Sequence, residues 1–143
     1  MASAVYPNLL VNALKGDTPL DSGDVKCLLY DTADGAYDPS DNDVADLTGA
    51  GIAGARSAAM GNKTFTIVDT HIFQFDGDNV VLSAVPAGDE CERAIFYYDP
   101  GTGDENCLLI SDNALTSAIT PNGGDITVSI NASGVLRVDC TPA

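Results

Sequence analysis

The stretch that decides the fold is CERAIFYY at residues 91–98, followed by the turn DPGTG at 99–103 and by CLLIS at 107–111. β-branched and aromatic residues are frequent on both sides of the turn, and Pro and Gly occupy the turn itself, so the pattern predicts a β-hairpin. If this hairpin is symmetric, Tyr97 lies opposite Leu108 and Ile95 lies opposite Ile110, which places four apolar side chains on one face. Cys91 and Cys107 are not opposed in that register, which argues against a disulfide between them.

Short extended segments divided by turns continue on both sides of this hairpin. We expect strands at residues 24–30, 52–57, 64–68, 71–75, 79–85, 125–130 and 134–138, with no helical pattern between them. Residues 76–78 (Asp-Gly-Asp) are typical of a hairpin turn, and residues 131–133 predict the turn of a final hairpin. Strands at this spacing predict an all-β fold, either an antiparallel β-sandwich or an open barrel.

A helical pattern is predicted for one segment, residues 6–15. Leu9, Leu10 and Leu14 fall near one face of this segment, and Gly16 ends it. A turn-rich connector follows, so the chain divides into an N-terminal arm or helix with its connector, residues 1–23, and a single β domain, residues 24–143. Because so short a helix is marginal by itself, it must pack either on its own β domain or on a neighbouring subunit.

Composition limits the class of partner. The chain has 143 residues, the size of one domain, and its 45% hydrophobic and 19% charged residues indicate a packed core. Six basic and 21 acidic residues give a net charge of −15, which opposes broad contact with nucleic-acid phosphates or anionic lipid. No apolar run approaches the ~18 residues of a membrane span. We therefore expect another protein as the partner, and neither nucleic acid nor a membrane.

Few residues are suited to catalysis. His71 is the only histidine, so a Ser-His-Asp or Cys-His site would have to use it, whereas its apolar neighbours predict a structural histidine in a strand. The four cysteines, Cys27, Cys91, Cys107 and Cys140, form no CxxC pair, so zinc is not indicated, and Cys27 is expected to be a small buried hydrophobe. The N-terminus lacks the basic start of a signal peptide, which predicts cytoplasmic synthesis and reduced thiols. With no phosphate-binding glycine loop and no GxSxG motif, we expect no enzyme, no cofactor and no metal.

Six aspartates crowd residues 31–46, the segment called the acidic loop below: Asp31, Asp34, Asp38, Asp41, Asp43 and Asp46. Calcium binds several oxygen ligands that converge from a loop, so a calcium site is one interpretation. The spacing departs from the EF-hand pattern, which has ligands at alternate positions, Gly at the sixth and Glu at the twelfth. A solvated loop whose Asp side chains form Asx turns explains the same residues, and we favour it.

The order of several short segments is more informative than any single residue. These segments are VKCLLYD (25–31), YDPS (37–40), DLTG (46–49), GNKT (61–64), VLSAV (81–85), AIFYYD (94–99), TPNGGDITV (120–128) and GVLRV (134–138). Over about residues 24–138 their pattern and order resemble those of a family of small structural proteins of tailed bacteriophages. The four cysteines and the acidic loop depart from the family pattern.

The resemblance implies a virion component, and above all a decoration (cement) protein that is made in the host cytoplasm and binds the major capsid protein on the outer capsid surface. For such a protein, Val5, Tyr6, Leu9 and Leu10 are the candidate capsid contacts, and self-association as a trimer is a further expectation. Two other readings stay open: a different virion part, such as a tail-tube or head-fibre subunit, and a calcium-dependent adhesive β-module.

Overall fold

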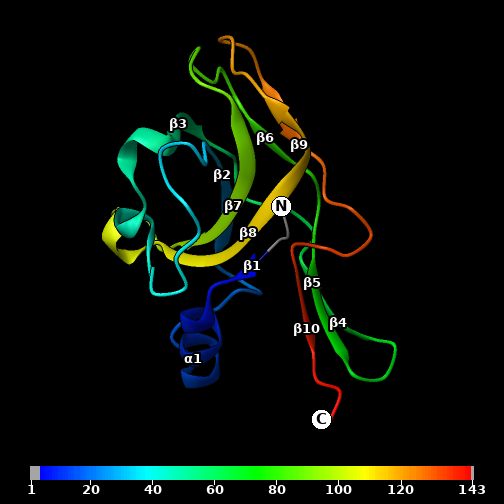
Figure 1. The fold of residues 1–143 in the computed structure, drawn as a ribbon. Helices are drawn as coiled ribbons and strands as arrows, with labels where there is room; N and C mark the ends of the chain where they lie inside the picture. The colour runs from blue at the N-terminus through cyan, green and yellow to red at the C-terminus, as the bar shows by residue number, and fades with distance from the viewer. Residues whose placement is uncertain (1–3, 143) are drawn as a thin grey trace.

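The computed structural model describes residues 4–142, which form three antiparallel sheets and one short α-helix near the N-terminus (Figure 1). The five-stranded sheet has the order β1-β8-β7-β2-β3, made by Ala4–Val5, Leu108–Ile119, Cys91–Asp99, Asp24–Tyr30 and Ile52–Arg56. A three-stranded sheet has the order β10-β5-β4, made by Leu136–Asp139, Ile72–Asp76 and Thr64–Val68. The strands β6 (Val80–Leu82) and β9 (Ile126–Val128) form a two-stranded sheet. The predicted all-β class is confirmed, and the arrangement is consistent with a sandwich.

Strand β2 shows why the five-stranded sheet is central. It pairs with β7 without a break, from Asp24 opposite Asp99 to Tyr30 opposite Arg93. Successive side chains of a strand point to opposite faces, and both faces are buried here: Cys27 belongs to the larger hydrophobic cluster and Leu28 to a second one on the other side. The apolar residues of this strand predict that both of its faces are buried, and the structure confirms this prediction.

The helix α1 spans Pro7–Lys15, so it begins one residue after the predicted start and ends where its sequence predicts. Proline at the first turn needs no N–H partner there. Gly16 adopts the left-handed conformation (φ 80°) and donates its N–H to the carbonyl of Ala13, which closes the helix. Three single-turn 3₁₀ helices lie in loops: η1 (Val44–Asp46), η2 (Gly49–Gly51) and η3 (Asp104–Asn106).

The β7–β8 hairpin forms, but the symmetric register predicted for it is wrong. Tyr97 lies opposite Leu109, and Ile95 lies opposite Asp112, because the pairing shifts just before Tyr97. Such a bulge changes the cross-strand partners without any signal in the alternation of the two strands. Strand β8 also continues to Ile119, well past its predicted end at residue 111.

Two other predicted hairpins do not form. Strand β5 pairs with β4 and β10, not with β6, so residues 76–78 do not join a hairpin. The hairpin that does form is β4–β5, and its turn places Asp69 and Thr70 at positive φ angles of 50° and 59°. The final hairpin is also wrong, since β9 pairs with β6 and β10 with β5. Alternation predicts where strands lie but not which sheet each one joins.

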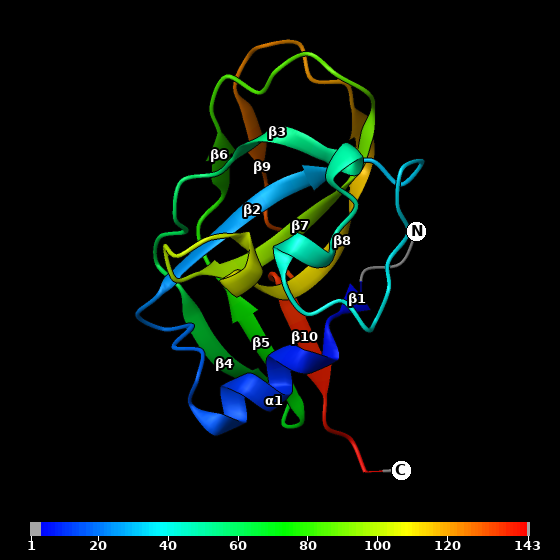
Figure 2. The ribbon, with the colours of Figure 1, turned by 90° about the vertical axis from the view of Figure 1, so that its left-hand side faces the viewer.

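Two views place the helix and the small sheet at one end of the molecule. In Figures 1 and 2, α1 and the strands β4, β5 and β10 extend from the same end of the five-stranded sheet, while β6 and β9 lie toward the other end. The β4–β5 turn forms the tip of the small sheet (Figure 1). The two elements at this end carry the surface described next.

Candidate docking surface

The segment before α1 is attached to the β domain of its own chain. β1 pairs with β8, with Val5 opposite Ser111, and the N–H of Tyr6 continues the pairing by donating to the carbonyl of Ile110 at 3.1 Å. The hydroxyl of Tyr37 donates to the carbonyl of Val5 at 2.8 Å, and the rings of Tyr6 and Tyr37 lie 5.1 Å apart. The helix is therefore positioned from its first residue by the domain on which it packs.

The four candidate capsid contacts lie in different environments. Tyr6 and Leu9 are 0% and 1% exposed and belong to the two hydrophobic clusters, and Val5 is half-buried. Leu10 is 42% exposed. Packing on the chain's own domain accounts for the first three residues, so Leu10 is the candidate whose side chain is accessible to a partner.

The apolar surface of α1 extends beyond Leu10. Val11 and Leu14 are 47% and 89% exposed, and both lie within one turn of Leu10 on the helix surface. Leu9 points into the core, and these three side chains leave the helix in other directions, so they face solvent. The sequence predicted Leu9, Leu10 and Leu14 near one face, but the structure buries Leu9 and leaves Leu10 and Leu14 exposed. Which side of the helix packs inward depends on the tertiary structure.

A second apolar surface lies on the small sheet. Phe65 and Ile67 of β4 are 38% and 75% exposed. They lie opposite Phe75 and Phe73 of β5, and the rings of Phe65 and Phe75 stack with centroids 4.8 Å apart. The strand was predicted with Phe65 and Ile67 on one face, but its position at the edge of a sheet was not.

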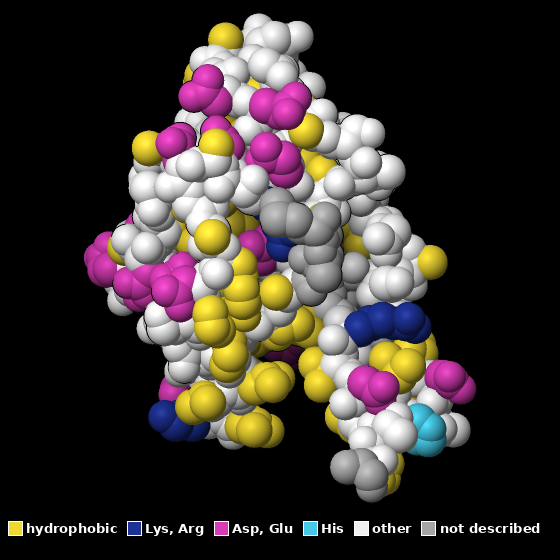
Figure 3. All heavy atoms as spheres, in the orientation of Figure 1, with side chains coloured by type: hydrophobic (Ala, Val, Ile, Leu, Met, Phe, Trp, Pro, Cys, Tyr) yellow, Lys and Arg dark blue, Asp and Glu magenta, His cyan; other side chains and the backbone are white. Residues whose placement is uncertain are grey.

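These two surfaces together form what we call the apolar end: α1 and the sheet β10-β5-β4. Among the large hydrophobic side chains exposed in residues 4–142, five of six lie on α1 or β4, and Val81 is the sixth. Figure 3 shows a hollow between the two parts, with hydrophobic atoms on the surfaces that border it. Exposed large apolar side chains that gather at one end of a protein often mark a binding surface.

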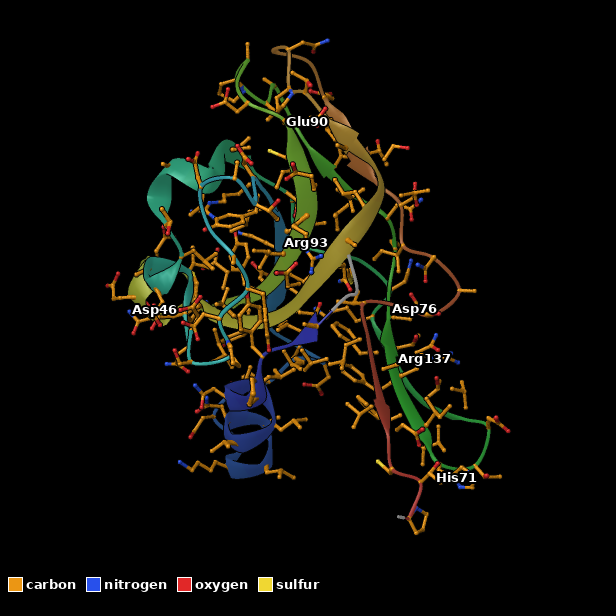
Figure 4. All side chains as sticks on the ribbon, viewed as in Figure 1. Asp46, His71, Asp76, Glu90, Arg93 and Arg137 are labelled. Atoms are coloured by element: carbon orange, nitrogen blue, oxygen red, sulfur yellow. The ribbon has the colours of Figure 1, made fainter. Side chains whose placement is uncertain are left out.

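The net charge of the chain lies outside the apolar end, where the exposed apolar side chains are few. The apolar end carries no net charge, because it has as many cations as carboxylates. The cations are Lys15, Lys63 and Arg137, and the carboxylates are Asp69, Asp76 and Asp139, counted over Pro7–Lys15, residues 63–76 and Leu136–Asp139. The net charge of −15 therefore belongs to the rest of the chain. Figure 4 shows Arg137 and His71 on the small sheet and Asp46 and Glu90 on the body of the molecule.

The other three cations form ion pairs in the body of the molecule: Lys26 with Asp99 at 2.7 Å, Arg56 with Asp104 at 3.1 Å, and Arg93 with Asp112. Arg93 and Asp112 are both almost fully buried. Burial raises the pKa of Asp112, and the hydrogen bond and charge of Arg93 oppose that rise. This pair borders a cavity of about 460 Å³ that Tyr30, Thr32 and Tyr37 also line.

The acidic loop contains the Asx turns that its sequence predicts. Asp31, Asp38 and Asp43 accept hydrogen bonds from the backbone N–H groups two residues later, at 2.7 to 3.1 Å. Asp43 and Asp46 form a reciprocal capping box around η1. The hydroxyl and N–H of Ser40 lower the pKa of Asp38, whereas burial and then neighbouring carboxylates raise the pKa of Asp43.

One group of carboxylates in this region converges. Asp31 and Asp34 of the acidic loop and Asp89, from the loop before β7, have oxygens within 4.8 Å of one another. Asp89 was not part of the predicted cluster, because it is distant in sequence. Three single oxygens are fewer than the six to eight ligands that calcium takes, and we assign no metal to them.

His71 and Cys140 are backbone neighbours, because the N–H of Cys140 donates to the carbonyl of His71 at 2.8 Å. His71 is exposed beside Thr70 at the β4–β5 turn, and β5 begins one residue later, so its predicted position within a strand is wrong. Cys27 is fully buried, as predicted. Cys91 lies opposite Ile119 and not opposite Cys107, so the predicted lack of opposition between these two cysteines is confirmed. Burial raises the pKa of the Cys91 thiol to about 11.

Comparisons with protein-family models, with curated proteins and with solved structures find no match for this chain. None of the helices formed by residues 4–142 has both the length and the hydrophobicity needed to cross a membrane.

Proposed function

We propose that this chain is a structural protein of a tailed-bacteriophage virion, which decorates the outside of the capsid shell and stabilises it by binding the major capsid protein. The observation that supports this proposal is the segregation of the surface into an apolar end with no net charge and an acidic body. The resemblance of the sequence to phage structural proteins supplies the identity of the partner.

This segregation suits a protein that adheres to a larger protein shell. Contact through the apolar end removes hydrophobic area from water, which is the main favourable term in most protein association. A subunit that binds the assembled shell and not its separated parts stabilises the shell by mass action. The acidic body then faces solvent, where its charge keeps particles soluble and apart.

The contact needs more than the helix. Specific interfaces bury about 800 Å² on each partner, and Leu10, Val11 and Leu14 provide only part of that area. We therefore place the apolar face of the small sheet, with Phe65 and Ile67, at the margin of the same contact. Tyr6 and Leu9 support the surface from within and do not touch the shell.

The test is co-sedimentation of the purified protein with undecorated phage heads. Leu14→Asp places a charge at the most exposed apolar position of α1, and Ala87→Asp adds the same charge at an exposed loop position outside the apolar end. We expect Leu14→Asp to weaken binding at least tenfold and Ala87→Asp to leave it within about twofold, since one desolvated charge costs more than the ~1.4 kcal/mol of a tenfold change.

Other outcomes separate the competing virion roles. A tail-tube subunit would assemble into rings or tubes without heads, whereas a decoration protein stays small until it meets a shell. Unimpaired binding of Leu14→Asp, or no binding of the unaltered protein at saturation, contradicts the proposal.

A further inference from the structure

We propose that β4 is a self-association strand: two copies of the chain pair β4 with β4 in antiparallel orientation about a two-fold axis through Thr66, which joins their small sheets into one sheet of six strands. This inference concerns the edge of the small sheet and does not depend on binding to a capsid.

The outer edge of β4 is available for pairing. In the order β10-β5-β4, the strand is hydrogen-bonded on one side only, to β5, from Thr64 opposite Asp76 to Val68 opposite Ile72. Within residues 4–142 no strand lies on its other side, and four of its five residues are exposed. A row of unpaired N–H and C=O groups of this kind is a template for another strand.

The sequence of β4 lacks the features that normally protect an edge. Thr64–Val68 (TFTIV) contains no charge and no proline, and its pairing with β5 has no bulge. Strand β10, at the other edge of the same sheet, carries Arg137 and Asp139. Charged side chains on an edge discourage strand addition, so pairing of β4 with β4 is favoured over pairing of β4 with β10.

The strand is complementary to itself in one register. With Thr66 on the two-fold axis, Phe65 lies opposite Ile67 of the second copy, and Ile67 lies opposite Phe65 of the second copy. Aromatic and β-branched residues are favourable cross-strand partners. The pairing places the two exposed apolar side chains of β4 beside those of the second copy and continues the apolar face that Phe73 and Phe75 begin.

Charge identifies a second copy as the occupant. Two chains of net charge −15 repel each other, and the repulsion is least where a surface carries no net charge. The small sheet and its neighbour α1 form the surface on which cations and carboxylates balance. Added salt screens the repulsion between the acidic bodies, so self-association through β4 should strengthen as ionic strength rises.

The register is tested by disulfide trapping. In a Cys140→Ser background, which removes the exposed thiol, Thr66→Cys places two thiols directly opposite each other across the axis. Thr64→Cys is the matched control, because the two copies of residue 64 lie about 13 Å apart along the paired strands. Both positions are exposed, so both reduced variants should keep the thermal midpoint of the parent.

We expect a covalent dimer from Thr66→Cys under mild oxidation and at least a tenfold lower yield from Thr64→Cys. Equal yields from the two variants, or no dimer from Thr66→Cys, overturn the proposed pairing. Preferential trapping through residue 64 would instead indicate a different register and also contradicts it.

A charge-swap experiment checks the same axis without oxidation. Thr66→Lys and Thr66→Glu should each sediment as monomers, because each places like charges opposite each other. An equimolar mixture should recover a species of twice the 14.7 kDa chain mass. At ~1 mM even a dimer with a Kd of about 1 mM is populated. The proposal is therefore refuted if the unaltered protein sediments as a single chain at this concentration.

Discussion

The opposite exposure of Leu9 and Leu14 allows a paired test of how α1 is attached. Leu9 is 1% exposed within the larger hydrophobic cluster, and Leu14, five residues later on the same helix, is 89% exposed. Leu→Ala removes the same atoms from both side chains, and it does not lower the helix propensity at either position. Any difference between the two variants therefore reports tertiary packing.

The structure sets the expected size of that difference. Truncation of a fully buried leucine costs about 2–5 kcal/mol, which combines lost transfer free energy with the cavity that remains. An exposed substitution away from special features changes the free energy of unfolding by about 0.5 kcal/mol or less. For a chain of this length each kcal/mol corresponds to roughly 3–5 °C in Tm, so Leu9→Ala should lower Tm by about 6–25 °C and Leu14→Ala by less than about 3 °C.

The assay is urea and thermal unfolding of dilute protein, followed by circular dichroism. The account requires the unfolding midpoint of Leu9→Ala to fall with no change in the denaturant slope, because only stability is altered. Equal losses for the two variants, or a loss below about 1 kcal/mol for Leu9→Ala, would mean that α1 does not pack on its own domain as described.

Four further outcomes follow. Arg93→Met should destabilise the fold by about 3–5 kcal/mol in urea unfolding, because it leaves the buried carboxylate of Asp112 unpaired; a loss under 1 kcal/mol would contradict the burial of this pair. The hydrogen bond from Lys26 lowers the pKa of Asp99 below its ordinary 3.8, so the stabilisation by this pair is present above that value and is lost as pH falls through the folded-state pKa; unfolding of Asp99→Asn should depend less steeply on pH between about 5 and 2. Calcium should shift Tm by less than about 2 °C relative to chelator, and a rise of many degrees would assign a metal to the acidic loop. Cys140 should react with a thiol reagent in the folded state, while the other three thiols should require unfolding.

The fold class could be predicted because alternation and turn residues are local signals. The strand at 24–30, the helix end at Gly16 and the Asx turns of the acidic loop all depend on residues within a few positions of one another, and all are present. The pairing of strands could not be predicted in the same way. Which sheet β9 and β10 join depends on where distant apolar residues are buried, and the shift in the β7–β8 register has no pattern of its own.

In the candidate docking surface, too, local features could be predicted from the sequence and tertiary ones could not. Sequence periodicity indicated the apolar residues of the N-terminal helix, but it could not show that Tyr6 and Leu9 pack inward while Leu10 and Leu14 face solvent. It also gave no reason to connect that helix with Ile67, fifty residues away in the sequence. The apolar end arises from the tertiary structure, which places two half-covered elements at the same end of the molecule.

In the proposed decoration role, the apolar end, and not the acidic body, adheres to the capsid shell. Electron cryo-microscopy of undecorated phage heads incubated with the purified protein tests this claim most directly, because it reports both occupancy and orientation. We expect density at regular lattice positions, with α1 and the small sheet against the shell and the acidic loop toward solvent. Bare heads at saturating protein, or bound subunits whose acidic loop faces the shell, would contradict it.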